Sequence, residues 1–131
     1  MKTQEFLESN GIDVEHGLEL LGDMEMYNET LEDFLTESET RLPNILKYKN
    51  EADMPNYAIL VHAMKSDSKY LGFTTLAELS YNHEMQSKAG NVSYVNENYD
   101  SLIKEANRII NVVKEYLGIW KVIAKFCQYL Y

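Results

Sequence analysis

Residues 53–72 read DMPNYAILVHAMKSDSKYLG, and this stretch carries the signals of one complete helix. Asp53 is a residue type that caps helix N-termini, and Pro55 falls in the first turn, where its missing N–H is not needed. Gly72 follows the last apolar residue, and glycine readily adopts the left-handed conformation that ends many helices. We therefore expect a helix that begins at Asp53 and ends in a tight turn with positive φ at Gly72.

The apolar residues of this helix share one face, and His62 lies on the opposite one. With a rotation of about 100° per residue, Leu60, Met64 and Leu71 lie roughly 160° to 200° from His62. These three side chains form the stripe that is expected to face a core. The imidazole therefore points into solvent from the middle of the helix.

Small, apolar and cationic residues surround His62 on this outer face. A neutral imidazole is nucleophilic near neutral pH, and the Lys65 ammonium one turn later can compensate an anion placed on the ring. The pattern suits a phosphoryl acceptor, although a plain solvated surface histidine stays open at this point. The neighbours on this face are Ala58, Ile59, Lys65, Ser66 and Lys69.

Composition narrows the class of protein. The chain has 131 residues, long enough for one domain with a core, and its net charge of −9 argues against binding nucleic acid or an anionic membrane. Cys127 is the only cysteine, so no internal disulfide forms. The N-terminus lacks the apolar segment of a signal peptide, and no apolar run reaches the roughly 20 residues of a membrane span. We expect a cytoplasmic protein.

Helical signals continue on both sides of the first stretch. Only six glycines and two prolines interrupt the sequence, which favours long helices. Pro43 lies inside one helical pattern and should kink that helix or restart it. Besides the helix at 53–72, we expect helices over about 2–9, 13–21, 23–48, 74–89 and 93–117, judged by caps, stops and apolar spacing.

No convincing alternating strand pattern accompanies these helices. Four of them are long and amphipathic, with short connections between them. Packing their apolar stripes together buries them most simply. The predicted fold class is therefore all-α: an antiparallel up-and-down four-helix bundle with one or two short additional N-terminal helices.

The sequence around His62 resembles a known motif. HAMKSDSKYLGF is similar to the phosphoacceptor motif of histidine-containing phosphotransfer (HPt) domains of two-component phosphorelays: His, two residues, Lys, a small residue, and Gly ten positions after the His. The segments GIDVEHGLELLGDMEMYNETLEDFL, LAELSYNHEMQSKAGNVSYV and YDSLIKEANRIINVVKEYL resemble other helices of the family in the same order. The resemblance covers about residues 11–117. One departure is Ser66, where the family often has Gly.

This resemblance implies a function and partners. His62 would receive a phosphoryl group from a receiver aspartate or a sensor histidine kinase and pass it to a response-regulator receiver domain. The protein would be a phosphocarrier without a cofactor and not an enzyme in its own right. Lys65 would neutralise the phosphoryl oxygens, Ser66 would let a receiver approach, and Glu84, by alignment, would hold Nδ1–H of the ring. Residues assigned to partner binding or to structure are Ala58, Ile59, Lys69 and, for the turn, Gly72.

Other kinds of site have less support. His16, His62, His83 and Glu84 lack the i, i+3 or i+4 pairing of metal ligands, so no metal site is predicted. No glycine-rich loop for a nucleotide is present, so the protein should not phosphorylate itself. The alternative function is a non-catalytic helical bundle that binds a receiver or a partner helix without phosphotransfer.

Two further expectations concern Asp67 and the C-terminus. Asp67 lies near the edge of the core and needs a hydrogen-bonding partner, for which Tyr81 or Tyr99 could serve. The bundle should span 1–118, and 119–131 form an apolar extension with helical spacing. Its apolar stripe must be buried either in the bundle or in a second subunit, so a dimer through this extension is possible in principle.

Overall fold

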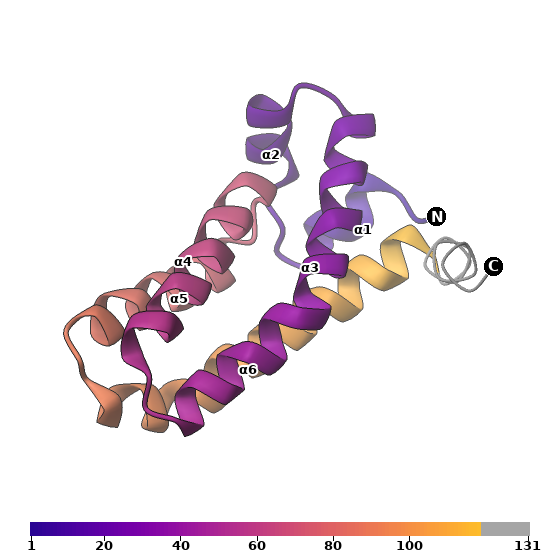
Figure 1. Cartoon of the computed structure of the whole chain (residues 1–131). Helices are drawn as coiled ribbons and strands as arrows, with labels where there is room; N and C mark the ends of the chain where they lie inside the picture. Colours follow the sequence, from indigo (N-terminus) through magenta and orange to yellow (C-terminus); the bar gives the residue numbers. More distant parts are fainter. Residues whose placement is uncertain (119–131) are drawn as a thin grey trace.

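The structure, a computed structural model, describes residues 1–118, which fold into six helices joined by short loops (Figure 1). No strand occurs between residues 1 and 118, so the prediction of an all-α protein is confirmed. The helices are α1 (Gln4–Ser9), α2 (Val14–Leu21), α3 (Met24–Asn50), α4 (Met54–Leu71), α5 (Thr74–Lys88) and α6 (Val92–Leu117).

The four longest helices, α3 to α6, form an antiparallel bundle in which each runs back along its predecessor (Figure 1). The pair α4 and α5 packs most extensively, and α6 closes the bundle against α3 and α5. The short α1 packs on α6 and α2, whereas α2 packs on α3 and α4. The predicted four-helix bundle with short additional N-terminal helices is confirmed.

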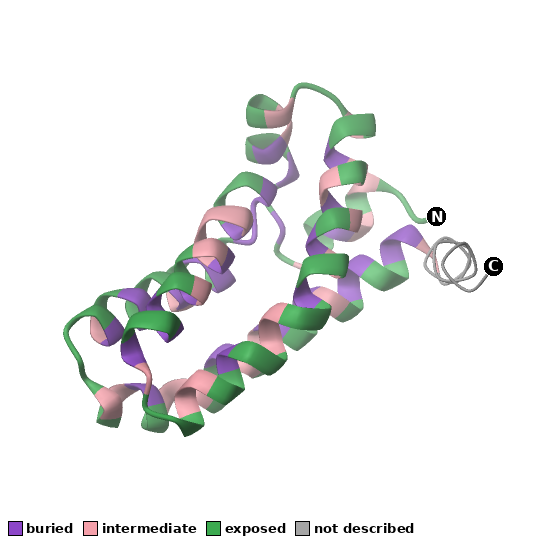
Figure 2. Cartoon of the chain, in the orientation of Figure 1, coloured by how far each residue is buried: buried purple, intermediate pink, exposed green. Residues whose placement is uncertain are grey.

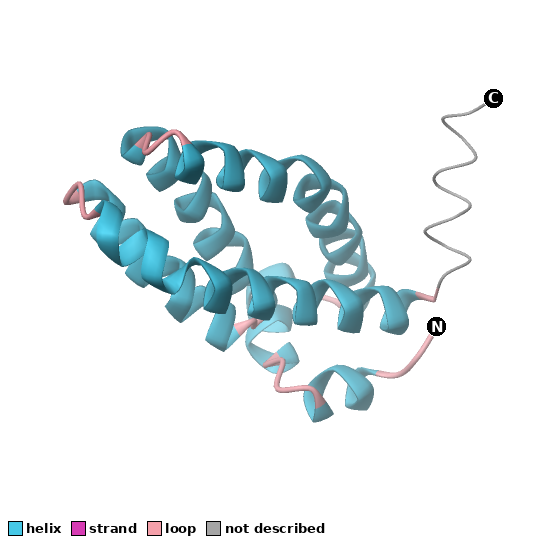
Figure 3. Cartoon of the chain, turned by 90° about the horizontal axis from the view of Figure 1, so that it is seen from below, coloured by secondary structure: helices cyan, strands magenta, loops and turns pink. Residues whose placement is uncertain are grey.

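Helix starts follow the capping residues in the sequence. The side chains of Asp13, Asp23 and Asp53 each accept a hydrogen bond from the backbone N–H three residues later, which pairs a donor that the helix leaves free. Asn91 caps α6 in the same way. Figure 3 shows the result from below, with long helices and only short loops at their ends.

Pro43 lies inside α3, and the helix runs through it without a break. The alternative of a restarted helix is therefore wrong. Proline removes one backbone donor. Phe34 before it and Ile45 after it are both buried in the core, and this packing stabilises the helix on each side of the proline.

The core lies between the inward faces of the helices, where buried residues concentrate (Figure 2). Tyr27, Tyr57 and Tyr116 are among the largest fully buried side chains. Burying one large apolar side chain stabilises a fold by about 1.5–3 kcal/mol. The polar tips are paired as well: the Tyr27 hydroxyl donates to the Leu71 carbonyl oxygen at 2.6 Å, which connects α3 to the end of α4.

Gly72, at the end of α4, contacts the start of α2 through the backbone. Its φ is +81°, in the left-handed region, and its carbonyl oxygen accepts a hydrogen bond from the Asp13 N–H at 2.9 Å. A Cβ atom at this position would lie 2.0 Å from the Asp13 carbonyl oxygen. Only glycine leaves room for this close approach of two backbones.

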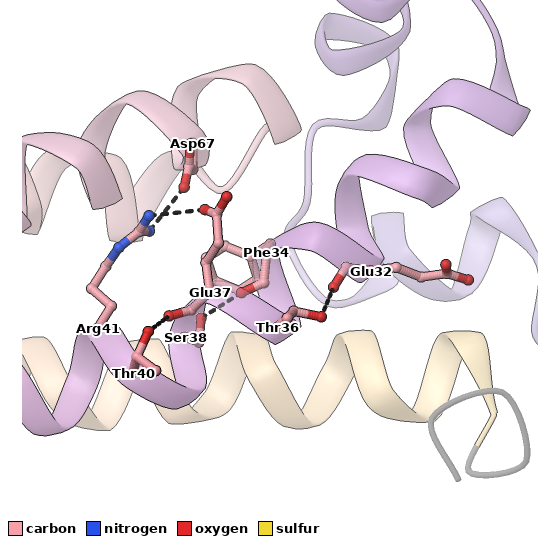
Figure 4. Close-up of polar contacts among 8 residues, drawn as sticks. All are labelled: Glu32, Phe34, Thr36, Glu37, Ser38, Thr40, Arg41 and Asp67. Carbon is pink, nitrogen blue, oxygen red and sulfur yellow. Dashed lines mark hydrogen bonds and ion pairs between the residues drawn. The ribbon is translucent and has the colours of Figure 1, made fainter. Parts of the chain in front are cut away.

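An arginine on α3 contacts the C-terminal part of α4 (Figure 4). The Arg41 guanidinium donates to the Asp67 carboxylate at 2.8 Å and to the Glu37 carboxylate at 2.9 Å. The expectation that Tyr81 or Tyr99 would pair with Asp67 is thus wrong. Both tyrosines have other neighbours: Tyr81 lies beside the Lys65 ammonium and Tyr99 beside the Lys49 ammonium.

Candidate functional site

His62 lies in the middle of α4, where the outer faces of α4 and α5 meet. Its side chain is 54% exposed, because the apolar residues of α4 turn the opposite way into the core. Its Nδ1 atom lies 2.5 Å from Oε2 of Glu84, one of the buried residues of α5. The two helices therefore hold an accessible imidazole against a buried carboxylate.

Glu84 is the carboxylate that the other ionisable side chains of this site contact. Only 2% of its side chain is exposed, yet it contacts two ammonium groups in addition to the imidazole. Lys65 Nζ lies 2.6 Å from Oε1, and Lys88 Nζ lies 2.9 Å from Oε2. Burial on its own would raise the pKa of Glu84, but the hydrogen bonds from Lys65, Lys88 and His62 outweigh it and lower the pKa to about 2.

The charge of Glu84 fixes the tautomer of the ring. An ionised carboxylate can only accept hydrogen bonds, so Nδ1 of His62 carries the proton. The lone pair is then on Nε2, the far nitrogen. A carboxylate on the near nitrogen also increases the basicity of the ring, as it does for histidines that bind metals. The arrangement leaves a free lone pair on Nε2 of an exposed ring.

The other residues predicted around His62 differ in exposure. Lys65 is mostly covered, with 15% of its side chain exposed, and its ammonium points at Glu84 beside the Tyr81 ring. Ser66 is half-buried and Lys69 is exposed. These residues lie along one strip of α4, from the imidazole toward Gly72.

A hollow adjoins the imidazole on the other side. Ile59 stands at its edge as an exposed apolar side chain, whereas Ala58 is only 5% exposed. Ala58 therefore forms part of the wall of the hollow and not an outer surface, because it lies on the side of α4 that turns toward α5. The hollow is lined by Pro55, Ala58, Ile59, His62, Ser87 and Lys88.

His83, next to Glu84 in sequence, belongs to the core. It is 1% exposed, and its Nδ1 shares a hydrogen bond with the Tyr57 hydroxyl at 2.8 Å. Burial lowers the pKa of His83, partly opposed by a hydrogen bond to the backbone of Asn98. Across residues 1–118, no three His, Cys, Asp or Glu side chains gather in a way that could hold a metal ion.

Two residues that make ion pairs with α4 or α5 were not singled out from the sequence: Lys88 at this site, and Arg41, which pairs with Asp67. Lys88 could have been found, because it lies four residues after Glu84 and such pairs meet on a helix surface. Arg41 could not, because it lies on another helix, 26 residues before Asp67.

The structure is thus a helical bundle in which an exposed imidazole contacts a buried carboxylate. The family model of the Hpt domain matches residues 29–112, which is more than half of the chain. The chain belongs to the Hpt domain family, whose members act as phosphocarriers in two-component signalling and interact with receivers and kinases. No curated protein and no solved structure matches the chain.

None of the helices within residues 1–118 combines the length and the apolar character that crossing a bilayer requires.

Proposed function

We propose that His62 carries a phosphoryl group between a sensor histidine kinase or receiver aspartate and the receiver domain of a response regulator, in the cytoplasm. One observation carries this proposal: an imidazole that is 54% exposed has its Nδ1 2.5 Å from a carboxylate with a pKa of about 2. A histidine that merely covers the surface has no need of a buried anion behind it.

The transfer step balances without an external base. The Nε2 lone pair attacks the phosphorus of the receiver's aspartyl phosphate and forms an N–P bond. The P–O bond to the aspartate breaks, and its electron pair stays on the carboxylate. Nδ1 keeps its proton, so the ring becomes cationic and Glu84 compensates that charge. In the onward transfer, a carboxylate oxygen of the next receiver's aspartate attacks the phosphorus and forms a P–O bond. The N–P bond breaks, and its electron pair returns to Nε2.

The neighbouring residues have assigned roles in this proposal. Glu84 orients the ring, and Lys65 contributes positive charge to the site where the phosphoryl group is held. Ser66 leaves room for the partner, and the region of Ala58, Ile59 and Lys69 contacts it. The contact should be modest in area, since a carrier has to release its partner.

The test uses a receiver that has been phosphorylated with labelled acetyl phosphate. We expect label to move to the wild-type protein and to a His16→Gln variant, whose histidine is exposed on α2. We expect none on His62→Gln. The labelled bond should be labile in acid and stable in base. ATP alone should give no label, because the sequence has no nucleotide-binding loop.

Two results would contradict the proposal. Label retained in His62→Gln would reject the phosphoacceptor. Tight receiver binding by the wild type without any transfer would support the alternative, a helical bundle that binds a receiver or a partner helix without phosphotransfer.

A further inference from the structure

We propose that Lys88, and not Lys65, supplies the ammonium that binds the phosphoryl group on His62, while Lys65 stays on Glu84 as a positioning residue. This inference rests on the proposed function. It divides between two lysines a role that the motif assigns to Lys65 alone.

The position of Lys88 places its ammonium next to the ring. Its Nζ lies 2.9 Å from Glu84 Oε2, the same oxygen that lies 2.5 Å from His62 Nδ1. Lys88 also lines the hollow beside His62. Its side chain is 60% exposed, whereas that of Lys65 is 15% exposed. Water can therefore solvate the Lys88 ammonium when it leaves Glu84, so Lys88 moves away more easily than Lys65.

Lys65 is held more firmly. Its Nζ lies 2.6 Å from Oε1, the oxygen of Glu84 that does not contact the ring, and only 15% of its side chain is exposed. If it left, a carboxylate that is 2% exposed would lose its most buried cation. Removing one partner from a buried ion pair is strongly destabilising, since the remaining charge is left uncompensated.

The charge balance after phosphorylation favours the same division. The phosphorylated ring is cationic and keeps Nδ1–H on Oε2, so it can replace Lys88 as the positive partner of that oxygen. Lys88 is then free to compensate the phosphoryl oxygens. Lys65 remains on Oε1, and every negative group in the site has a positive neighbour.

The experiment compares the phosphotransfer equilibrium of Lys88→Gln, Lys88→Arg and Lys65→Gln with that of the wild type. A matched control is Lys104→Gln, an exposed lysine on α6. Labelled receiver and full-length protein are brought to equilibrium, and the ratio of label on His62 to label on the receiver is measured. In parallel, NMR records the Nδ1 proton of unphosphorylated His62 and the titration of the Glu84 carboxylate.

For Lys88→Gln we expect the equilibrium to shift toward the receiver by roughly 10-fold, the worth of one charge-assisted hydrogen bond. Its Nδ1 proton signal should remain, and Lys88→Arg should recover the wild-type ratio. For Lys65→Gln we expect a raised pKa of Glu84 and a weakened Nδ1 proton signal before any phosphate is present. Lys104→Gln should match the wild type.

A wild-type ratio in Lys88→Gln would overturn the inference, as would a 10-fold shift in Lys65→Gln with an unchanged Nδ1 proton and Glu84 titration. In both cases the wild type still carries label on His62, so the proposed function stands. If the wild type takes no label at all, the proposed function and this inference fail together.

Discussion

Glu84 is the residue on which the charges of the site depend. It is a buried carboxylate with an imidazole and two ammonium groups within 2.9 Å, and it stays ionised for that reason. A residue with so low a pKa in the folded state also links the stability of the protein to pH.

The folded pKa of Glu84, about 2, lies below its ordinary value of 4.5. The carboxylate therefore stabilises the fold above pH 4.5, and this contribution is lost as the pH falls toward 2. Its full size is at most about 3 kcal/mol. We expect the free energy of unfolding, measured with urea from pH 6 to pH 2, to fall more steeply for the wild type than for Glu84→Gln.

The exposed Glu78 of α5 provides the control. Glu78→Gln should keep the acid dependence of the wild type. Parallel curves for the wild type and Glu84→Gln would contradict the ion pairs described for Glu84.

For single residues, the direction of a side chain and the conformation of a helix end could be predicted from the sequence. The outward direction of His62 follows from the core stripe of its own helix, and the positive φ at Gly72 follows from a helix stop. The burial of Glu84 could not be predicted, because it depends on how α4 and α5 pack. The prediction of Tyr81 or Tyr99 as the partner of Asp67 was wrong for the same reason. Periodicity within one helix does not reveal which side chain of another helix contacts Asp67.

At the scale of elements, helix ends were easier to predict than contacts between helices. Asp13, Asp23 and Asp53 mark helix starts because a side-chain oxygen three residues before a free N–H is a local feature. Pro43 is a local signal that tertiary packing overrides. The junction of α2 and α4 at Gly72 and the Arg41 contact with α4 are not local, and both lead to predictions.

Gly72→Ala should destabilise the protein by about 3 kcal/mol or more, since positive φ and a clash with the Asp13 carbonyl combine. Gly90→Ala is the matched control. Its φ is +74°, but no atom lies within 4 Å of the added Cβ, so a loss of only about 1 kcal/mol is expected. Chemical denaturation measures both, and equal losses would contradict the close approach at Gly72.

The Arg41–Asp67 contact should appear as a coupling energy. Arg41 is 11% exposed and Asp67 33% exposed, so the pair is more protected from solvent than a surface ion pair. In a double-mutant cycle with Arg41→Gln and Asp67→Asn, we expect a coupling of about 1 kcal/mol in the free energy of unfolding. Additive effects of the two changes would show that the contact contributes nothing to the joining of α3 and α4.

At the scale of the whole molecule, the four-helix bundle positions the proposed site, and the residues of that site lie on α4 and α5. Family membership follows from the match over residues 29–112, and the fold was predictable because four amphipathic helices with short loops have few ways to bury their stripes. The predicted apolar extension at 119–131 lies outside the residues that the structure describes.

The predicted apolar stripe of 119–131 must be buried in the bundle or in a second subunit. If a second subunit buries it, deleting 119–131 should convert a dimer to a monomer, measured as mass in solution. Phosphotransfer should stay unchanged, because every residue of the proposed site lies before Ala89. A monomer both before and after the deletion would exclude the dimer.

The central claim is that one nitrogen of one histidine carries the phosphoryl group. The most direct measurement is NMR of ¹⁵N-histidine-labelled protein after transfer from a phosphorylated receiver, with ³¹P–¹⁵N coupling used to locate the bond and tandem mass spectrometry to locate the residue. The account predicts a single phosphoryl group on Nε2 of His62, with Nδ1 still protonated. A phosphoryl group on Nδ1, on His16 or on His83 would contradict it.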